Sequence, residues 1–410
     1  MGDRKGKQSQ VSVGIVSESD YGEFGNDEDC EGTAGVGGVG RVGKDLHKKT
    51  FDEGTYTKLN IFKSHLIEWL PVFLKTSHIK ELNIIDAFSG PGFDLLGNKG
   101  SPLIIMDVIK LYLPNLSDKR INIFLNEFKK RKYEKLKNEI NILLDTHEGL
   151  RKNVSVRIES KDFKSFFESI KSFLNQKIPN FLFLDQNGIK FITQDVFRYL
   201  VNLEKTDFLF YISSSYLRRF GNKPEFSKYI NISQEELRKR PFHEIHLEIV
   251  DFFQNMIPDS LDDYWLYPFS IKKGGNVYGL IFGSRNILAA DKFLSVAWGS
   301  NPINGTANFD IEQDEQKSRE NSEIPLFQYL HKQTKVQAFQ NLISDRILSG
   351  EIKDNLILYV ETLRSGHLPK HSREVLINLK YKGKIIYDGN APAVSYKAWR
   401  DKNIKNWRII

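Results

Sequence analysis

Short apolar runs alternate with amphipathic stretches along the first half of the chain. The runs have the length of buried strands, whereas apolar residues between them recur every three or four positions, as on one face of a helix. The expected strands cover 82–86, 121–126, 154–159, 181–185 and 207–213. The expected helices cover 57–74, 101–113, 130–144 and 163–174. This alternation predicts an α/β fold with a doubly wound parallel sheet.

The pattern changes in the second half of the chain. Two apolar runs, 265–271 and 277–282, flank a Lys-Lys-Gly-Gly-Asn stretch, and this arrangement favours an antiparallel hairpin that closes the sheet. A further helix is expected over 289–298. Near the C-terminus, helices are expected over 326–347, 352–364 and 370–382, followed by a short β-wing at 384–389. A helix pair followed by a wing resembles a winged helix.

Composition divides the chain into four expected segments. Residues 1–50 contain 11 of the 29 glycines and are expected to be disordered, because they cannot bury enough surface to offset chain entropy. Residues 51–310 hold the α/β pattern. Residues 311–325 are acidic and are expected to form a solvated linker. Residues 326–410 form the basic helical module.

The charge of the chain is concentrated in that last module. The net charge is +7, and residues 369–410 contain ten Lys and Arg against three Asp and Glu, which is also +7. A basic terminal module attracts phosphates, so DNA or RNA is the expected partner, although a solvated basic surface has the same composition. The candidate nucleic-acid-binding residues are Lys370, His371, Arg373, Lys380 and Lys384.

Several classes of protein are not expected. No run of 18 apolar residues is present, so we expect no membrane span, and the N-terminus lacks a secretory signal pattern. The single cysteine, Cys30, excludes a disulfide framework and a cysteine-based zinc site. His243 and His246 lie one helical turn apart but have no apparent third ligand, so no metal site is expected. These features together predict a cytoplasmic protein.

The strongest chemical signal is a glycine-bearing turn after the first expected strand. The sequence from Asp86 to Gly92 reads Asp-Ala-Phe-Ser-Gly-Pro-Gly. Gly90 and Gly92 let backbone N–H groups approach a ligand that a side chain would block. A dinucleotide fingerprint would require a third glycine where Leu95 stands. The motif instead resembles motif I of class I S-adenosylmethionine methyltransferases, so Asp86, Phe88, Gly90 and Gly92 are candidate cofactor-binding residues; an ordinary turn is the alternative.

Acidic residues follow the next three expected strands. Glu127 follows the second strand and could accept hydrogen bonds from two ribose hydroxyls of a cofactor. Asp162 follows the third strand and could accept a hydrogen bond from the amino group of a cofactor adenine, with Phe163 against the adenine ring. Alternatively, Asp162 could simply cap the next helix. Asp185 and Asn187 follow the fourth strand and are the candidate catalytic residues.

The catalytic stretch differs from that of methyltransferases that act on exocyclic amines. In those enzymes the Asp or Asn is followed by prolines and an aromatic residue, and its side chain accepts the amine hydrogens. Here Asp185 is followed by Gln-Asn-Gly, so both the proline and the aromatic residue are missing. A turn at Asn187-Gly188 is the alternative.

These motifs together resemble the three-Cys-motif partner protein family, TcmP, over roughly residues 55–390. The resemblance rests on the following segments: 57–59 (Thr-Lys-Leu), 86–92, 100–104 (Gly-Ser-Pro-Leu-Ile), 183–185, 305–310 (Gly-Thr-Ala-Asn-Phe-Asp) and 366–371 (Gly-His-Leu-Pro-Lys-His). It implies a bacterial protein with a Rossmann-like methyltransferase core, paired with a three-Cys-motif protein of the radical-SAM type. The family's usual Asp-Pro-Phe-Gly is Asp-Gln-Asn-Gly here.

Three functions are compatible with these residues. The first is an S-adenosylmethionine-dependent methyltransferase that acts on nucleic acid. The second is a non-catalytic adaptor that keeps a methyltransferase-like fold and binds nucleic acid and a protein partner. The third is a Mg²⁺-dependent nuclease in which Asp86, Glu127 and Asp185 gather around the metal.

Overall fold

The structure is a computed structural model, and it describes residues 50–116, 118–174, 177–186, 191–213, 235, 239, 245–261, 263–323 and 331–410. The glycine-rich segment 1–49 and the catalytic candidate Asn187 lie outside the described residues. So do His243 and the side chain of His246. No helix within the described ranges is long and apolar enough to cross a membrane.

Seven strands form one sheet in the order β3-β2-β1-β4-β5-β7-β6. They are β1 (Glu81–Asp86), β2 (Arg120–Asn126), β3 (Val154–Glu159), β4 (Asn180–Leu184), β5 (Thr206–Ile212), β6 (Trp265–Lys273) and β7 (Asn276–Ser284). The first five strands are parallel, and β7 is antiparallel to both of its neighbours. This is the strand arrangement of a Rossmann-like methyltransferase, so the predicted fold class is confirmed.

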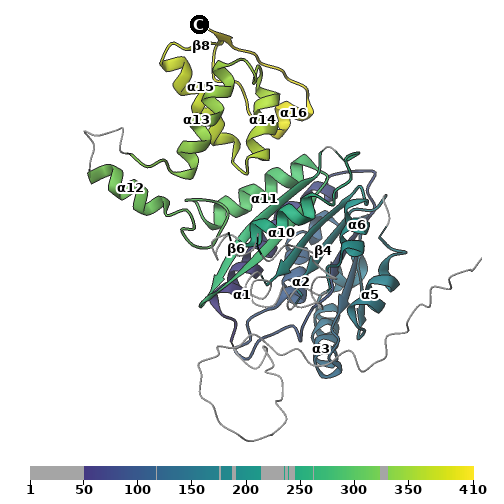
Figure 1. The fold of residues 1–410 in the computed structure, drawn as a ribbon. Helices are drawn as coiled ribbons and strands as arrows, with labels where there is room; N and C mark the ends of the chain where they lie inside the picture. Colours follow the sequence, from purple (N-terminus) through teal and green to yellow (C-terminus); the bar gives the residue numbers. More distant parts are fainter. Residues whose placement is uncertain are drawn as a thin grey trace, which may run out of the picture.

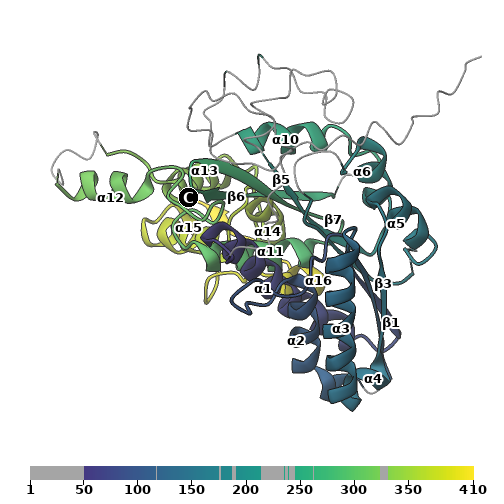
Figure 2. The same ribbon diagram turned by 90° about the horizontal axis from the view of Figure 1, so that it is seen from below.

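Helices cover both faces of the sheet (Figures 1 and 2). One face carries α1 (Glu53–Leu74), α2 (Ser101–Leu111), α3 (Lys130–Thr146), the short α4 (Glu148–Asn153) and α11 (Ile287–Ser300). The other face carries α5 (Phe163–Ile170), α6 (Gln194–Val201) and α10 (Ile245–Gln254). Each face has its own hydrophobic cluster, which is why the parallel strands are apolar on both sides.

A ladder of buried polar side chains crosses the amino ends of four strands. Asn83 of β1 donates from Nδ2 to Oδ1 of Asn180 at 2.8 Å and accepts at its own Oδ1 from Nδ2 of Asn122 at 3.1 Å. Asn180 in turn donates to Oγ1 of Thr206 at 3.0 Å. A one-residue slip of any strand would leave these buried groups unpaired, so the ladder helps to set the register of the sheet.

The C-terminal module is built from small helices and a two-stranded wing. It contains α12 (Asp314–Glu323), α13 (Lys335–Leu348), α14 (Asn355–Arg364), α15 (Pro369–Tyr381), β8 (Ile385–Ile386), α16 (Tyr396–Arg400) and β9 (Arg408–Ile409). Strands β8 and β9 pair antiparallel. The helices and the wing agree with the predicted winged helix.

The acidic segment 311–325 is not the solvated loop that its composition suggested, since it contains α12. The carboxylate of Asp310 accepts the backbone N–H groups of Asp314 at 2.8 Å and Glu315 at 2.9 Å, which starts the helix. The side chain of Asp314 is buried and accepts the backbone N–H of Lys335 at 2.9 Å. Local capping and this contact with the start of α13 therefore stabilise α12.

The module packs on α11 of the sheet domain (Figure 1). The hydroxyl of Tyr267 donates to the carbonyl oxygen of Leu363 at 2.9 Å, and that of Tyr359 donates to Oδ2 of Asp291 at 2.8 Å. Close packing at the same interface explains a glycine of the Gly-Thr-Ala-Asn-Phe-Asp motif, because a Cβ at Gly305 would lie 2.4 Å from the ring of Trp298. The module and the sheet domain thus share one hydrophobic cluster.

Candidate functional site

The glycine turn lies at the carboxyl ends of β1 and β2. Gly90 and Gly92 adopt φ values of 64° and 94°, a left-handed backbone that glycine adopts without strain. The N–H of Ser89 donates to the carbonyl oxygen of Asn126 at 2.9 Å, which holds the turn against the end of β2. The strand order reverses between β1 and β4, and ligands of open α/β sheets bind at such a reversal.

Asp86 is fully buried at the start of this turn. Its Oδ2 accepts the hydroxyl of Ser101 at 2.7 Å, and its Oδ1 accepts the N–H of Phe88 at 3.2 Å. Burial, with a smaller contribution from the nearby charge of Asp185, raises the pKa of Asp86 to about 7, although these hydrogen bonds oppose the shift. Ser101 does not cap α2, because Gly100 occupies the cap position and the serine hydroxyl donates to Asp86.

Glu127 faces the glycine turn from the end of β2. Its carboxylate accepts the N–H of Lys129 at 2.7 Å and also the N–H of Gly90. Partial burial raises the pKa of Glu127, while these N–H groups and the nearby cations Lys132 and Lys129 oppose the shift. The structure therefore brings Glu127 beside the turn, as the predicted ribose contact requires.

Asp162 has a clear structural role. Its Oδ1 accepts the N–H of Ser165 at 3.0 Å and its Oδ2 accepts the hydroxyl of Ser165 at 2.6 Å, so it caps α5. The capping alternative is confirmed, and a contact with adenine stays a prediction. The ring of Phe163 stacks on that of Phe88 at 5.3 Å between centroids, so these two aromatic residues pack together next to the turn.

A buried cation that was not predicted from the sequence holds Asp185. The buried Lys58 of α1 donates from Nζ to Oδ1 of Asp185 at 2.7 Å and to Oδ2 at 2.6 Å. The same ammonium lies 4.3 Å from the centroid of the Tyr211 ring, a cation–π contact. One signal was available, because Lys58 falls at helical spacing with the buried Phe62 and His65. A lysine within an apolar stripe requires a buried partner.

Two buried amides hold the loops around the site. Asn126 donates from Nδ2 to the carbonyl oxygens of Ala87 at 3.3 Å and Lys161 at 3.0 Å, which joins the loops after β1 and β3. Gln186 accepts the N–H of Phe191 at 2.9 Å at its Oε1. This side-chain hydrogen bond ties Gln186, just after the end of β4, to Phe191.

The nuclease hypothesis lacks a metal-binding cluster. Within the described part of the chain, no group of three or more His, Cys, Asp or Glu side chains is placed to hold a metal ion. Both carboxylate oxygens of Asp185 bind Lys58 rather than facing Asp86 and Glu127 across a shared ion. The predicted gathering of the three carboxylates is therefore wrong.

The candidate nucleic-acid residues of α15 and the wing separate into two groups. Lys370, Arg373 and Lys384 are exposed. His371 is buried, and its ring centroid lies 4.6 Å from that of Trp298, so the prediction that it faces a ligand was wrong. Lys380 is exposed but donates from Nζ to the carbonyl oxygens of Tyr387 at 3.0 Å and Gly389 at 3.2 Å, which ties α15 to the wing.

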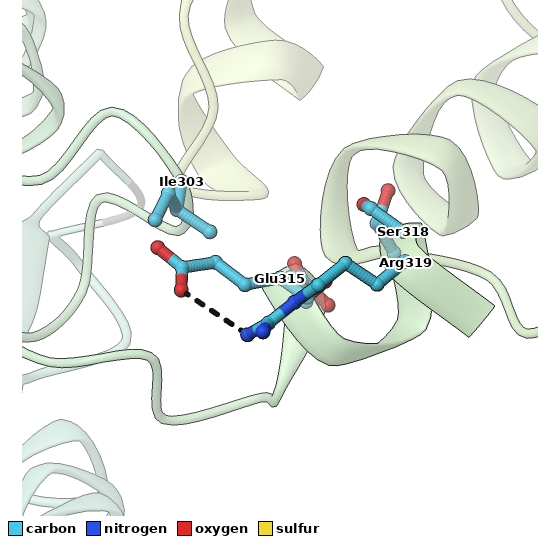
Figure 3. Close-up of a pocket in the computed structure, with 6 residues that line it drawn as sticks. Ile303, Glu315, Ser318 and Arg319 are labelled. Atoms are coloured by element: carbon cyan, nitrogen blue, oxygen red, sulfur yellow. Dashed lines mark hydrogen bonds and ion pairs between the residues drawn. The ribbon is translucent and has the colours of Figure 1, made fainter. Parts of the chain in front are cut away.

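A cavity of about 530 Å³ lies between α12 and the loop that precedes it (Figure 3). Ile303 forms an apolar wall of this cavity. Arg319 and Glu315 of α12 form an ion pair there, with 3.9 Å between Nη2 and Oε2. None of the residues around Asp86, Glu127 or Asp185 lines it. We therefore place the site at the glycine turn, where the buried Asp86, the partly buried Glu127 and the strand ends meet.

The C-terminal module is similar in sequence to a known domain family. Residues 310–392 match the family described as the GMT-like wHTH domain, which confirms the predicted winged helix. No curated protein matches the sequence.

Three solved methyltransferase structures are similar to part of the chain. The METTL16 methyltransferase domain is 12% identical over 54% of this chain and 66% of its own length, with a TM-score of 0.27. The N-terminal domain of human METTL16 in complex with SAH is 13% identical over 56% and 70%, with a TM-score of 0.26. A SAM-dependent methyltransferase from Agrobacterium tumefaciens is 8% identical over 55% and 61%, with a TM-score of 0.29. The chain thus spans about two thirds of these structures, and at these scores no argument rests on them.

Proposed function

We propose that this protein is an S-adenosylmethionine-dependent methyltransferase that acts on nucleic acid and works with a three-Cys-motif protein. The observation that carries the proposal is the position of Gly90, Gly92 and Glu127 at the adjoining ends of β1 and β2, in a sheet of methyltransferase strand order. The exposed cations of the winged helix support a nucleic-acid substrate. The partner is proposed from the resemblance to the TcmP family.

The donor and acceptor set at the turn fits this cofactor. Glu127 offers carboxylate oxygens beside Gly90 for the two ribose hydroxyls, and the glycines have no Cβ that would block a ligand at the turn. Asp86 would offer its buried carboxyl group to a positively charged ligand at the turn. The cofactor would supply an electrophilic methyl group on a sulfonium.

Asp185 is the residue that would contact the acceptor atom of the substrate. Its carboxylate can accept a hydrogen bond from the N–H of a group such as an exocyclic amine, and so orient the nitrogen lone pair of that group. Lys58 fixes the position of the carboxylate by bonding both of its oxygens. Lys58 is therefore a positioning residue.

The non-catalytic adaptor is the second candidate function, and one observation favours it. The ammonium of Lys58 already binds both oxygens of Asp185, at 2.7 and 2.6 Å, which leaves less capacity for a substrate amine. Binding of S-adenosylmethionine without methyl transfer to any DNA or RNA would favour the adaptor. Failure to bind S-adenosylmethionine or S-adenosylhomocysteine at millimolar concentration would remove the methyltransferase function.

We expect the affinity for S-adenosylmethionine to rise with pH. Asp86 has a pKa of about 7 in the free protein, against 3.8 for an ordinary aspartate, so about half of the molecules carry a proton there at neutral pH. A bound cation favours the ionised carboxylate, so binding of S-adenosylmethionine releases this proton. The affinity should therefore rise about tenfold from about pH 6 to about pH 8. Calorimetry measures this, and Asp86→Asn should abolish the dependence. A flat profile in the wild type would contradict the assignment of Asp86 to the site.

The same pKa shift predicts how stability changes with pH. Because the folded protein binds a proton at Asp86 that the unfolded chain releases above about pH 4, the free energy of unfolding should fall as pH rises from about 4 to about 7. The wild type and Asp86→Asn should therefore differ most in denaturant midpoint near neutral pH. This measurement needs no ligand.

We expect the winged helix to contribute most of the nucleic-acid affinity. Deleting the module would expose the cluster it shares with α11, so charge reversal is the better test. Lys370→Glu, Arg373→Glu and Lys384→Glu together should weaken duplex binding by at least tenfold and flatten its salt dependence. Cofactor binding should not change, because α15 and the wing lie far from α2 and α3, the helices that follow β1 and β2 (Figure 1). Wild-type binding by this variant would instead favour a role of the module in docking a protein.

A further inference from the structure

A second cluster of cations lies on the sheet domain, at the start of α3. Four consecutive residues, 129–132, read Lys-Lys-Arg-Lys, and the first three are exposed. The cap position itself is Lys129, whose side chain makes no capping hydrogen bond. Within the described residues, Lys130 and Arg131 form no ion pair and no side-chain hydrogen bond.

This arrangement does not serve the helix. The amino end of a helix carries partial positive charge, so cations there are unfavourable and an acidic residue or a Ser, Thr, Asp or Asn cap is preferred. The first turn of α3 contains no acid, and its last turn contains no base. The charges of α3 thus oppose its dipole, and helix stability does not explain them.

The cluster adjoins the candidate cofactor site. The N–H of Lys129 bonds Glu127 at 2.7 Å, and Glu127 also accepts the N–H of Gly90. One and a half turns further along α3, Leu136 packs against the glycine turn, since a Cβ at Gly92 would lie 3.8 Å from its Cδ1. The start of α3 is therefore fixed beside the turn.

Next to the cations stands Phe128, whose side chain is 69% exposed. Exposed cations beside an exposed aromatic ring are the surface that binds a nucleic-acid strand, in which phosphates meet the charges and a base stacks on the ring. Figure 1 places α3 at the opposite end of the molecule from α13–α16, so this surface is separate from that of the winged helix.

We propose that Lys130 and Arg131, with Lys129, bind backbone phosphates of the nucleic-acid substrate beside the methyl-transfer site. This inference rests on the proposed function. The winged helix would supply general affinity, and the α3 cluster would hold the strand at the cofactor. The chemistry recognised is the phosphodiester backbone, so the contact does not depend on base sequence.

The test compares two double variants of the full chain that remove the same charge from the same helix. Lys130→Gln with Arg131→Gln removes the two unpaired cations, and Lys135→Gln with Lys137→Gln is the matched control, since both control residues are exposed further along α3. Fluorescence anisotropy with a short labelled DNA duplex, its RNA counterpart and the single strands measures affinity from about 50 to about 200 mM salt.

We expect the first variant to lose affinity by on the order of 10- to 100-fold and its salt slope to fall by roughly 1.8, while the control stays near the wild type. The melting temperature of the Lys130→Gln, Arg131→Gln variant should be unchanged or higher, because the removed charges oppose the helix dipole. Equal binding by the two variants, with wild-type binding intact, would overturn the inference alone. Absence of nucleic-acid binding by the wild type would overturn the proposed substrate as well. Calorimetry with S-adenosylmethionine distinguishes this outcome from failure of the cofactor site, because the wild type would then still bind the cofactor.

Discussion

Gly90→Val is expected to abolish binding of S-adenosylmethionine while the protein still folds. Gly90 is buried in the turn with φ of 64°, next to the carboxylate of Glu127. A valine there places two methyl groups where the cofactor would lie and forces a β-branched residue into a left-handed backbone. Calorimetry with S-adenosylmethionine measures the loss, and circular dichroism with a melting curve measures the fold.

Gly97→Val is the matched control for this substitution. Gly97 has φ of 80° in the exposed loop after the turn, and nothing lies within 4 Å of a Cβ built there. Both variants should lose roughly 1–2 kcal/mol of stability from the backbone conformation. Loss of cofactor binding in both would mean that strain, not occupied space, is responsible.

Glu127→Gln is expected to give a graded effect at the same site. The change keeps the shape and removes the charge, so a charge-assisted ribose contact worth about 1.5–3 kcal/mol is lost. Affinity should then fall by roughly one to two decades. An unchanged dissociation constant would make Glu127 an ordinary acid at the end of a strand.

The sheet could be predicted from the sequence because each strand carries its own signal. Apolar runs of strand length, each followed by a helical stripe, identified all five parallel strands to within a residue or two of β1–β5. The hairpin followed from the glycines between β6 and β7. Strand-end residues such as Asp86 and Glu127 were located by the same pattern, since the ends of parallel strands meet at one edge of the sheet.

Side-chain contacts between distant segments could not be predicted in the same way. The pair of Lys58 and Asp185 joins residues 127 positions apart, and periodicity shows only which face a residue occupies. His371 was assigned to nucleic-acid binding because a histidine can carry a positive charge. Its spacing with Val375 and Leu379, however, places it on the buried face of α15. Charge suggested a surface role where spacing indicated the core.

The helix α12 was missed for a related reason. Its sequence is polar throughout, so it has no apolar stripe to detect. Its order comes from the capping carboxylate of Asp310 and from the contact between Asp314 and Lys335, neither of which is visible in composition.

Lys58→Met is expected to reduce methyl transfer strongly while leaving cofactor affinity nearly unchanged. Methionine keeps the apolar stem but removes the ammonium that holds both oxygens of Asp185. The carboxylate, which is 23% exposed, would rotate and hydrate, and preorganisation of such a group is worth on the order of 10²–10³ in kcat. The lost charge-assisted hydrogen bonds should also lower stability by about 1–3 kcal/mol.

A mutant cycle separates this positioning role from a general effect on the fold. Lys63→Met is the matched control, because Lys63 is exposed on the same helix. If Lys58 acts only through Asp185, the double variant Lys58→Met with Asp185→Asn should transfer methyl groups no more slowly than Asp185→Asn alone. Additive losses in kcat would place Lys58 in direct contact with the substrate. Full activity of Lys58→Met would leave the pair as a structural contact between α1 and the loop after β4, with catalysis located elsewhere.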